Sequence, residues 1–130
     1  MICIELPLQV ILPRKKTHGK KYIINFNNFC NWHFHARSDV KNKYKAEIRE
    51  QLEGLKFYGK IKLTFVVHRP NKRSADRSNI CALHEKYFCD AMQDFRCIPD
   101  DNDEHIESTT YKTGAIDNKN PCVRVYIEEL

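Results

Sequence analysis

The sequence predicts a single α+β domain over residues 1–130, in which two helices pack on one face of a mixed β-sheet. Apolar residues recur at helical spacing in two segments, and β-branched or alternating runs occupy the others. In chain order the expected elements are strand, strand, helix, strand, helix, strand and strand. The composition, 42% hydrophobic and 11% aromatic, suffices for one core and argues against disorder.

The N-terminal part of the sequence predicts a β-hairpin followed by a helix. Residues 3–12 and 20–27 read as strands around the basic, turn-rich segment "PRKKTHGK". Pro7 lacks a backbone donor, so it places the first strand at an edge or a bulge. The helix is predicted over "SDVKNKYKAEIREQLEGL", with Ser38 or Asp39 as its cap and Gly54 at its end. Its buried face consists of residues four apart, namely Val40, Tyr44, Ile48 and Leu52.

The second half predicts a strand, a helix and two further strands. "KIKLTFVVHRP" alternates and ends at Pro70, which leads into the basic loop "RPNKRSA". A helix beginning at Asp76 places apolar side chains on one side, namely Ile80, Phe88, Ala91, Met92 and Phe95, with Leu83 and Tyr87 at the border. After a turn at residues 99–102, strands are expected over residues 104–112 and over "PCVRVYIEEL".

A polar stripe follows the second helix on the side that the core does not use. At 100° per residue, Asn79, Lys86 and Asp90 fall within about 80° of Asp76, whereas Glu85 falls about 180° away from it. Further acids follow the other end of the helix, in the predicted turn. Taken alone, these acids indicate a helix cap and an acidic turn, both of which are common.

Charge is divided between the two parts of the chain. Residues 1–75 hold 16 Lys and Arg against 5 Asp and Glu, whereas residues 76–130 hold 6 against 12, within a net charge of +5. A basic surface attracts a polyanion, but a compact acidic cluster beside it repels that polyanion unless cations neutralise the acids. The division favours nucleic acid together with a divalent metal, with two solvated faces of opposite sign as the alternative.

Cysteine usage and hydropathy predict the setting of the protein. The six cysteines form no CxxC pair and no zinc-finger spacing, so we expect buried, reduced thiols. No apolar run approaches the roughly 20 residues that a membrane-spanning helix needs, and residues 1–12 lack a basic leader and a cleavage site. We therefore expect a cytoplasmic protein with no membrane partner.

Several motifs occur in an order that resembles the RusA family of Holliday-junction resolvases. They are D-x-x-N after a basic loop (Asp76, Asn79), K-x-x-x-D-A-M on the helix (Lys86, Asp90) and a D-D turn before a strand, at residues 100–101. The similarity covers residues 65–128, and reaches the N-terminal third only through element order and an Asn-containing aromatic loop, "FNNFCNWHF". It implies a RusA-like fold, a homodimer and, because such proteins are frequent in phages and prophages, a bacterial host cell.

Two departures from the family pattern bear on the implied metal site. The family has D-x-D-N, and this chain carries Ser78 in place of the second carboxylate. The family also has fewer residues between the Asn and the Lys, so Lys86 matches only with an insertion of about four residues. Four residues turn a helix by about 400°, which keeps the Lys near the same face. The inserted turn leaves open that Glu85 replaces the missing ligand.

The resemblance implies a Mg²⁺-dependent endodeoxyribonuclease, with Mn²⁺ as the alternative metal. A metal held by carboxylates activates water, neutralises phosphate charge and assists the departing 3′ oxygen. The implied catalytic residues are Asp76, Asp101 and Lys86, with Asp76, Asp100 and Asp101 as metal ligands and Lys86 on phosphate or nucleophile. Supporting positions are Asn79, Ser78, Asp90 and Glu85. These residues converge only if the fold returns the 100–101 turn to the start of the helix.

The expected substrate is branched DNA such as a four-way junction, whose approximate two-fold symmetry suits a dimer with two active sites. Candidate phosphate contacts flank the implied site and the hairpin turn: Arg69, Lys72, Arg73 and Arg77, and Lys15, Lys16, Lys20 and Lys21. Trp32, His33 and His35 fit either base stacking or packing against the sheet, and both stay open. The alternative function is a DNA-binding accessory protein of recombination that keeps the fold and has weak or no catalysis.

Overall fold

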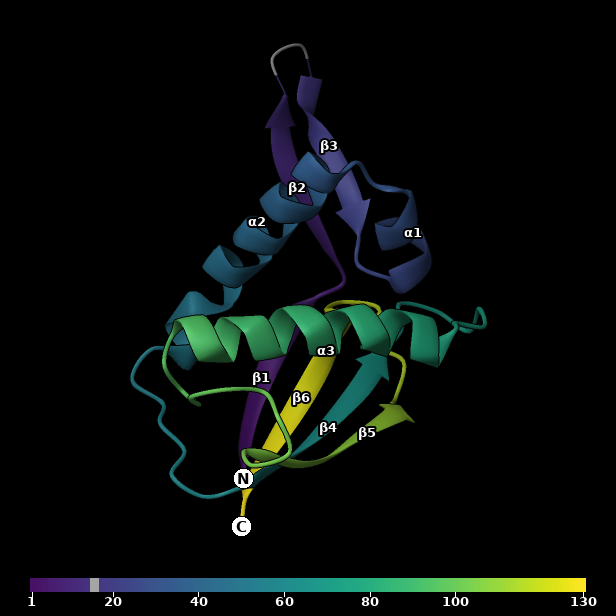
Figure 1. Cartoon of the computed structure of the whole chain (residues 1–130). Coiled ribbons are helices and arrows are strands. Elements are labelled where there is room, and N and C mark those ends of the chain that lie inside the picture. Colours follow the sequence, from purple (N-terminus) through teal and green to yellow (C-terminus); the bar gives the residue numbers. More distant parts are fainter. Residues whose placement is uncertain (15–16) are drawn as a thin grey trace.

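The computed structural model describes residues 1–14 and 17–130 and has an α+β fold with a mixed sheet (Figure 1). The main sheet has the order β1-β6-β4-β5, formed by β1 (Ile2–Pro7), β6 (Cys122–Glu129), β4 (Ile61–His68) and β5 (Ile106–Thr113). β4 and β5 are parallel, whereas β6 runs antiparallel to β1 and β4. The predicted class and the mixed sheet are confirmed.

The first predicted strand is in fact two strands that belong to different sheets. β1 pairs with β6, whereas β2 (Gln9–Arg14) pairs with β3 (Thr17–Ile23) in a two-stranded hairpin. Pro7 cannot continue the ladder, so the chain leaves the main sheet there, and β1 lies at the sheet edge as predicted. The hairpin stands away from the main sheet in Figure 1. Lys15 and Lys16 lie outside the described residues.

Two helices depart from the predicted boundaries. α1 (Phe26–Asn31) was not predicted, and forms because the Asn25 side chain accepts the backbone N–H of Asn28 at 2.8 Å. α2 (Phe34–Leu52) begins before the predicted Ser38 or Asp39 cap. Its cap is His33, whose ring accepts the backbone N–H of His35. Histidine is not one of the usual capping residues, so the sequence did not indicate this start.

The third helix, α3 (Arg77–Asp94), begins at the predicted Asp76 cap and lies across one face of the main sheet (Figure 1). It buries aromatic and aliphatic side chains, including Phe88, against Phe65 of β4. α2 instead packs against α3, the edge strand β1 and the hairpin strand β2, so the prediction of two helices on one sheet face is wrong for α2. Its predicted buried series from Val40 to Leu52 is confirmed.

A buried polar pair joins α2 to α3. The hydroxyl of Tyr44 lies 2.8 Å from Nδ1 of His84, and both side chains are enclosed by the core. Burial lowers the pKa of His84 to about 3, so its ring is neutral at physiological pH. The pair therefore belongs to the packing of the two helices.

The structure also bears on the predictions of reduced, buried cysteines and of no membrane-spanning helix. Cys81, Cys89, Cys97 and Cys122 are free and buried as predicted, whereas Cys3 and Cys30 are free but exposed, contrary to the prediction. None of the helices within residues 1–14 and 17–130 combines the length and the apolar character that crossing a bilayer requires.

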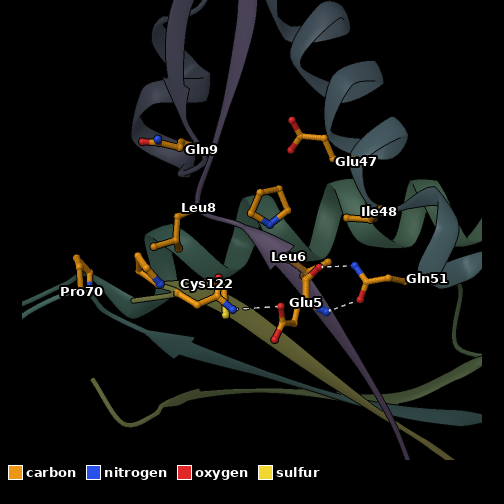
Figure 2. Close-up of a pocket in the computed structure, with 12 residues that line it drawn as sticks. Glu5, Leu6, Leu8, Gln9, Glu47, Ile48, Gln51, Pro70 and Cys122 are labelled. Carbon is orange, nitrogen blue, oxygen red and sulfur yellow. Dashed lines mark hydrogen bonds between the residues drawn. The ribbon is translucent and has the colours of Figure 1, made fainter. Parts of the chain in front are cut away.

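The outer edge of β1 is covered by a side chain of α2. Gln51 accepts a hydrogen bond from the backbone N–H of Glu5 and donates one to the Glu5 carbonyl, both at 2.8 Å (Figure 2). These backbone groups would otherwise be open to another strand, which is how edge strands recruit unwanted partners. The side-chain amide thus links α2 to the sheet and closes part of its edge.

Replacing Gln51 tests this contact. Gln51→Ala should lower the free energy of unfolding by about 1–2 kcal/mol, because two hydrogen bonds are lost. Urea denaturation measures the change, and Glu50→Ala, an exposed substitution on the same helix, should stay near the wild-type value. Equal stability of the two variants would show that the Gln51 pair contributes nothing measurable.

Candidate active site

A cleft of about 290 Å³ lies between the middle of α3 and the start of β5. Helix residues Glu85, Lys86 and Cys89 form one wall, and the 101–103 turn and residues 106–109 form the other. We call this cleft the acidic cleft. Its charged lining residues are Glu85, Lys86, Asp101, Asp103 and Glu107. The fold therefore brings carboxylates from three separate segments to one place.

Glu85 is held at the wall of the cleft by β5. It lies four residues from both Cys81 and Cys89, which are buried, so the helix turns Glu85 toward the sheet side. Its carboxylate accepts a hydrogen bond from the Tyr111 hydroxyl at 2.5 Å. Burial and this bond raise the pKa of Tyr111, which keeps the hydroxyl protonated and donating at neutral pH.

Asp100 shapes the turn that presents Asp101. The Asp100 carboxylate accepts the backbone N–H of Asp101 at 2.8 Å and side-chain N–H groups of Gln93 at 2.9 Å and Asn102 at 3.2 Å. These bonds tie the turn to the end of α3. Asp100 thus organises the turn, and Asp101 lines the acidic cleft.

The electrostatic field in the cleft is negative. Burial raises the pKa of the Cys89 thiol, and the charges of Glu85, Asp101 and Asp90 raise it further. Glu107 pairs with Lys60 at 3.3 Å, and Lys86 supplies one cation to the lining. The carboxylates outnumber these cations, so DNA phosphate would be repelled unless a further cation is bound.

Asp76 does not line the acidic cleft. Its carboxylate caps α3 by accepting the backbone N–H of Asn79 at 3.1 Å, and the Asn79 side chain accepts the N–H of Asn27 at 2.7 Å, which docks α1 on α3. Glu85 lies nine residues further on, which is about 13 Å along a helix. Ser78 is exposed in the first turn. The length of α3 thus separates Asp76 at its start from Lys86 and Asp101 at the cleft.

The donor chemistry of the acidic cleft fits a hard divalent cation, because carboxylate oxygens are the ligands that Mg²⁺ prefers. Within residues 1–14 and 17–130, no three His, Cys, Asp or Glu side chains are arranged to hold a metal ion as they stand. Asp101 and Asp103 are exposed, so their side chains can turn toward an ion next to Glu85. The cleft therefore offers the donors without a preformed cage.

Sequence reasoning missed Asp103, Glu107 and Tyr111, and gave Glu85 only a supporting place. A signal for Glu107 and Tyr111 exists, because strand residues four apart share one face and this face of β5 meets α3. A signal for Glu85 is its position between Cys81 and Cys89 on one line of the helix. Neither signal identifies the partner element without the sheet order.

The predicted phosphate contacts occupy two places. Arg69, Lys72, Arg73 and Arg77 lie in or beside the loop between β4 and α3, hereafter the basic loop. Within it, Arg69 donates to the Arg73 carbonyl at 2.8 Å, and Arg77 reaches Thr113 of β5 at 3.4 Å. Lys20 and Lys21 lie exposed on β3 of the hairpin. The basic loop and the acidic cleft therefore lie along the same helix, one at its start and one at its middle.

A larger cavity, of about 500 Å³, lies where β1, β2, α2 and the chain before β6 meet (Figure 2). Glu5 is paired there with Gln51, with the Asn120 side chain at 3.2 Å and with Arg124 at 3.5 Å. Its other lining includes Pro7, Pro70 and Leu8. These groups stabilise the contact between the hairpin and the main sheet. The acidic cleft is the better candidate for an active site.

No protein-family model matches the chain, and no curated protein sequence is similar to it.

Proposed function

We propose that this chain is a RusA-type, Mg²⁺-dependent endonuclease that hydrolyses a phosphodiester bond in branched DNA such as a Holliday junction. One observation supports this most: Glu85, Lys86 and Asp101 come from separate parts of the chain and share one acidic cleft on the helix that starts at the basic loop. DNA phosphates at the basic loop and a metal ion in the acidic cleft would thus lie along one helix, α3.

The side chains of the cleft suit phosphodiester hydrolysis. Glu85, Asp101 and Asp103 would hold Mg²⁺. When bound, the ion would lower the pKa of a water and neutralise charge on the phosphate. Lys86 is exposed at the cleft, where its ammonium can contact a phosphate oxygen as negative charge develops. Arg69, Arg73 and Arg77 would contact neighbouring phosphates and fix the position of the strand.

The proposal extends to assembly and location. A four-way junction presents two equivalent strands, so a homodimer with two-fold symmetry would place one acidic cleft on each. We propose that this dimer acts in the cytoplasm of a bacterial host cell. The competing function is an accessory protein that binds junctions without cutting them, which the missing carboxylate at Ser78 would favour if the metal belonged at the start of α3.

A single comparison separates the two functions. The purified protein is incubated with an end-labelled four-way junction, or with a linear duplex of the same sequence, in Mg²⁺, Mn²⁺ or EDTA. We expect cleavage of the junction with Mg²⁺ or Mn²⁺, none in EDTA, and an intact linear duplex. Junction binding in EDTA without cleavage in either metal would establish the accessory function, and the absence of both binding and cleavage would reject both.

A further inference from the structure

An exposed aromatic step lies where the hairpin meets α2, away from the acidic cleft. The rings of His33, Phe34 and His35 lie beside one another, with centroids 4.8 Å apart for His33 and Phe34 and 3.9 Å apart for Phe34 and His35. All three side chains are exposed, and Phe34 retains 66% of its accessible surface. We call these three residues the aromatic step. No core contact explains why a phenylalanine is kept in solvent between two other rings.

The aromatic step lies beside a cluster of packed aromatic side chains. Trp32, the residue before it, packs edge-on against Tyr22 of β3 at 5.3 Å and against Phe29 of α1 at 6.2 Å. Phe29 in turn contacts Tyr87 of α3 at 6.3 Å. Trp32, which precedes the step, thus joins it to the hairpin and, through Phe29, to the helix that carries Glu85 and Lys86.

Cations surround this cluster. The Lys20 ammonium lies 5.0 Å from the centre of the Tyr22 ring, and Arg14 donates to the Tyr22 hydroxyl at 3.3 Å. The Arg37 guanidinium lies 4.4 Å from the Phe29 ring and donates to the carbonyls of Phe29 and Cys30. Residues 6–38 contain six Lys and Arg and no Asp or Glu. Asp39 follows in α2 and lines a pocket with Arg14 and Tyr22, so cations outnumber acids around these rings. Exposed rings in such a basic region are the combination that binds the bases and backbone of an unpaired nucleic-acid strand.

We propose that the aromatic step is a stacking site for unpaired DNA bases, such as those exposed at the branch point of a junction, with Phe34 as its central ring. The inference rests on the proposed DNA substrate. It adds a second contact surface with a separate task, since the basic loop and the acidic cleft address phosphates whereas the step addresses base faces. Stacking is tolerant of sequence because every base has an aromatic face, which suits selection by DNA structure.

The test measures binding of the full chain in EDTA, where no cleavage occurs, to a single-stranded oligothymidine and to a junction carrying 2-aminopurine at its branch point. Phe34→Ala should weaken oligothymidine binding by about ten-fold, without changing the slope of log affinity against log salt concentration, because a stacking contact rather than a phosphate contact is lost. It should also reduce the fluorescence change at the branch point. Phe34→Trp should restore both signals.

Tyr58→Ala provides the matched control. Tyr58 is an aromatic residue that is 88% exposed and lies between α2 and β4, outside both the cleft and the step, so its removal should leave binding at the wild-type value. Thermal unfolding checks that each variant is folded. Equal binding by Phe34→Ala and Tyr58→Ala, or no binding of oligothymidine by the wild type, would overturn the inference.

Two further outcomes have defined meanings. If Phe34→Ala changes the oligomeric state and leaves oligothymidine binding unaltered, the step is a protein interface and the stacking proposal is wrong. If the wild type binds single strands through Phe34 but cuts no junction in any metal, the nuclease function fails while the stacking site stands. The two proposals can thus fail separately.

Discussion

Asp101→Asn is expected to reduce junction cleavage at least about a hundred-fold, because it weakens binding of the metal that would stabilise the developing charge. Asp101 lines the acidic cleft from a turn that Asp100 organises, so the substitution removes a charge and a proposed metal ligand with little change in shape. Junction binding in EDTA should stay equal or become tighter, because one carboxylate that repels phosphate is gone.

Single-turnover cleavage with Mg²⁺ and anisotropy in EDTA measure the two effects of Asp101→Asn separately. Glu104→Gln is the matched control, because Glu104 is an exposed acid close to the same turn and does not line the cleft. It should cleave at the wild-type rate. Cleavage by Asp101→Asn at that same rate would remove Asp101 from the mechanism.

A comparable loss is expected for Glu85→Gln, whereas Ser78→Asp should give no gain. Glu85 shares the acidic cleft with Asp101, while Ser78 is exposed near the start of α3 and does not line the cleft. Loss of the Glu85 charge should raise the Mg²⁺ concentration that gives half-maximal cleavage, because a hard cation binds more weakly to fewer anionic oxygens. A carboxylate added at Ser78 lies too far away to compensate.

Titrations of cleavage with Mg²⁺, together with calorimetry of Mg²⁺ binding, distinguish these variants. Glutamine keeps an oxygen that can accept the Tyr111 hydroxyl, so Glu85→Gln should unfold at nearly the wild-type urea concentration. The opposite pattern, in which Ser78→Asp improves the response to metal and Glu85→Gln is neutral, would place the metal next to Asp76. The ligand set implied by the RusA resemblance would then replace the one proposed for the acidic cleft.

Much of the fold could be predicted because apolar spacing reports burial directly. The four-residue series on α2 and the Asp76 cap appear where the sequence placed them. On α3, Phe88, Ala91 and Met92 are buried as predicted, whereas Ile80 and Phe95 are half-buried. The split between β1 and β2 could not be predicted, since both halves have the same strand pattern and only the choice of partner separates them. α1 was missed because a six-residue helix with no buried side chain leaves no periodic signal.

The candidate site was harder to predict than the fold. Asp101 and Lys86 were selected from the sequence, and the structure places them in one cleft. The helix phase was measured from Asp76, which made Glu85 appear to point away from the site. The phase itself was sound, but β5 rather than the helix start forms the opposite wall. Which strand faces a helix depends on sheet order, and no local pattern encodes it.

β6 lies between β1 and β4 in the main sheet, although it follows every other element along the chain. During synthesis, β1 and β4 therefore cannot both pair with β6 until residues 122–129 have been translated and have left the ribosome. The β4–α3–β5 unit can pair before that point, because its two strands contact each other directly. A nascent chain that stops short of β6 leaves β1 unpaired and β4 paired on only one side, so stalled translation yields a sheet without its centre.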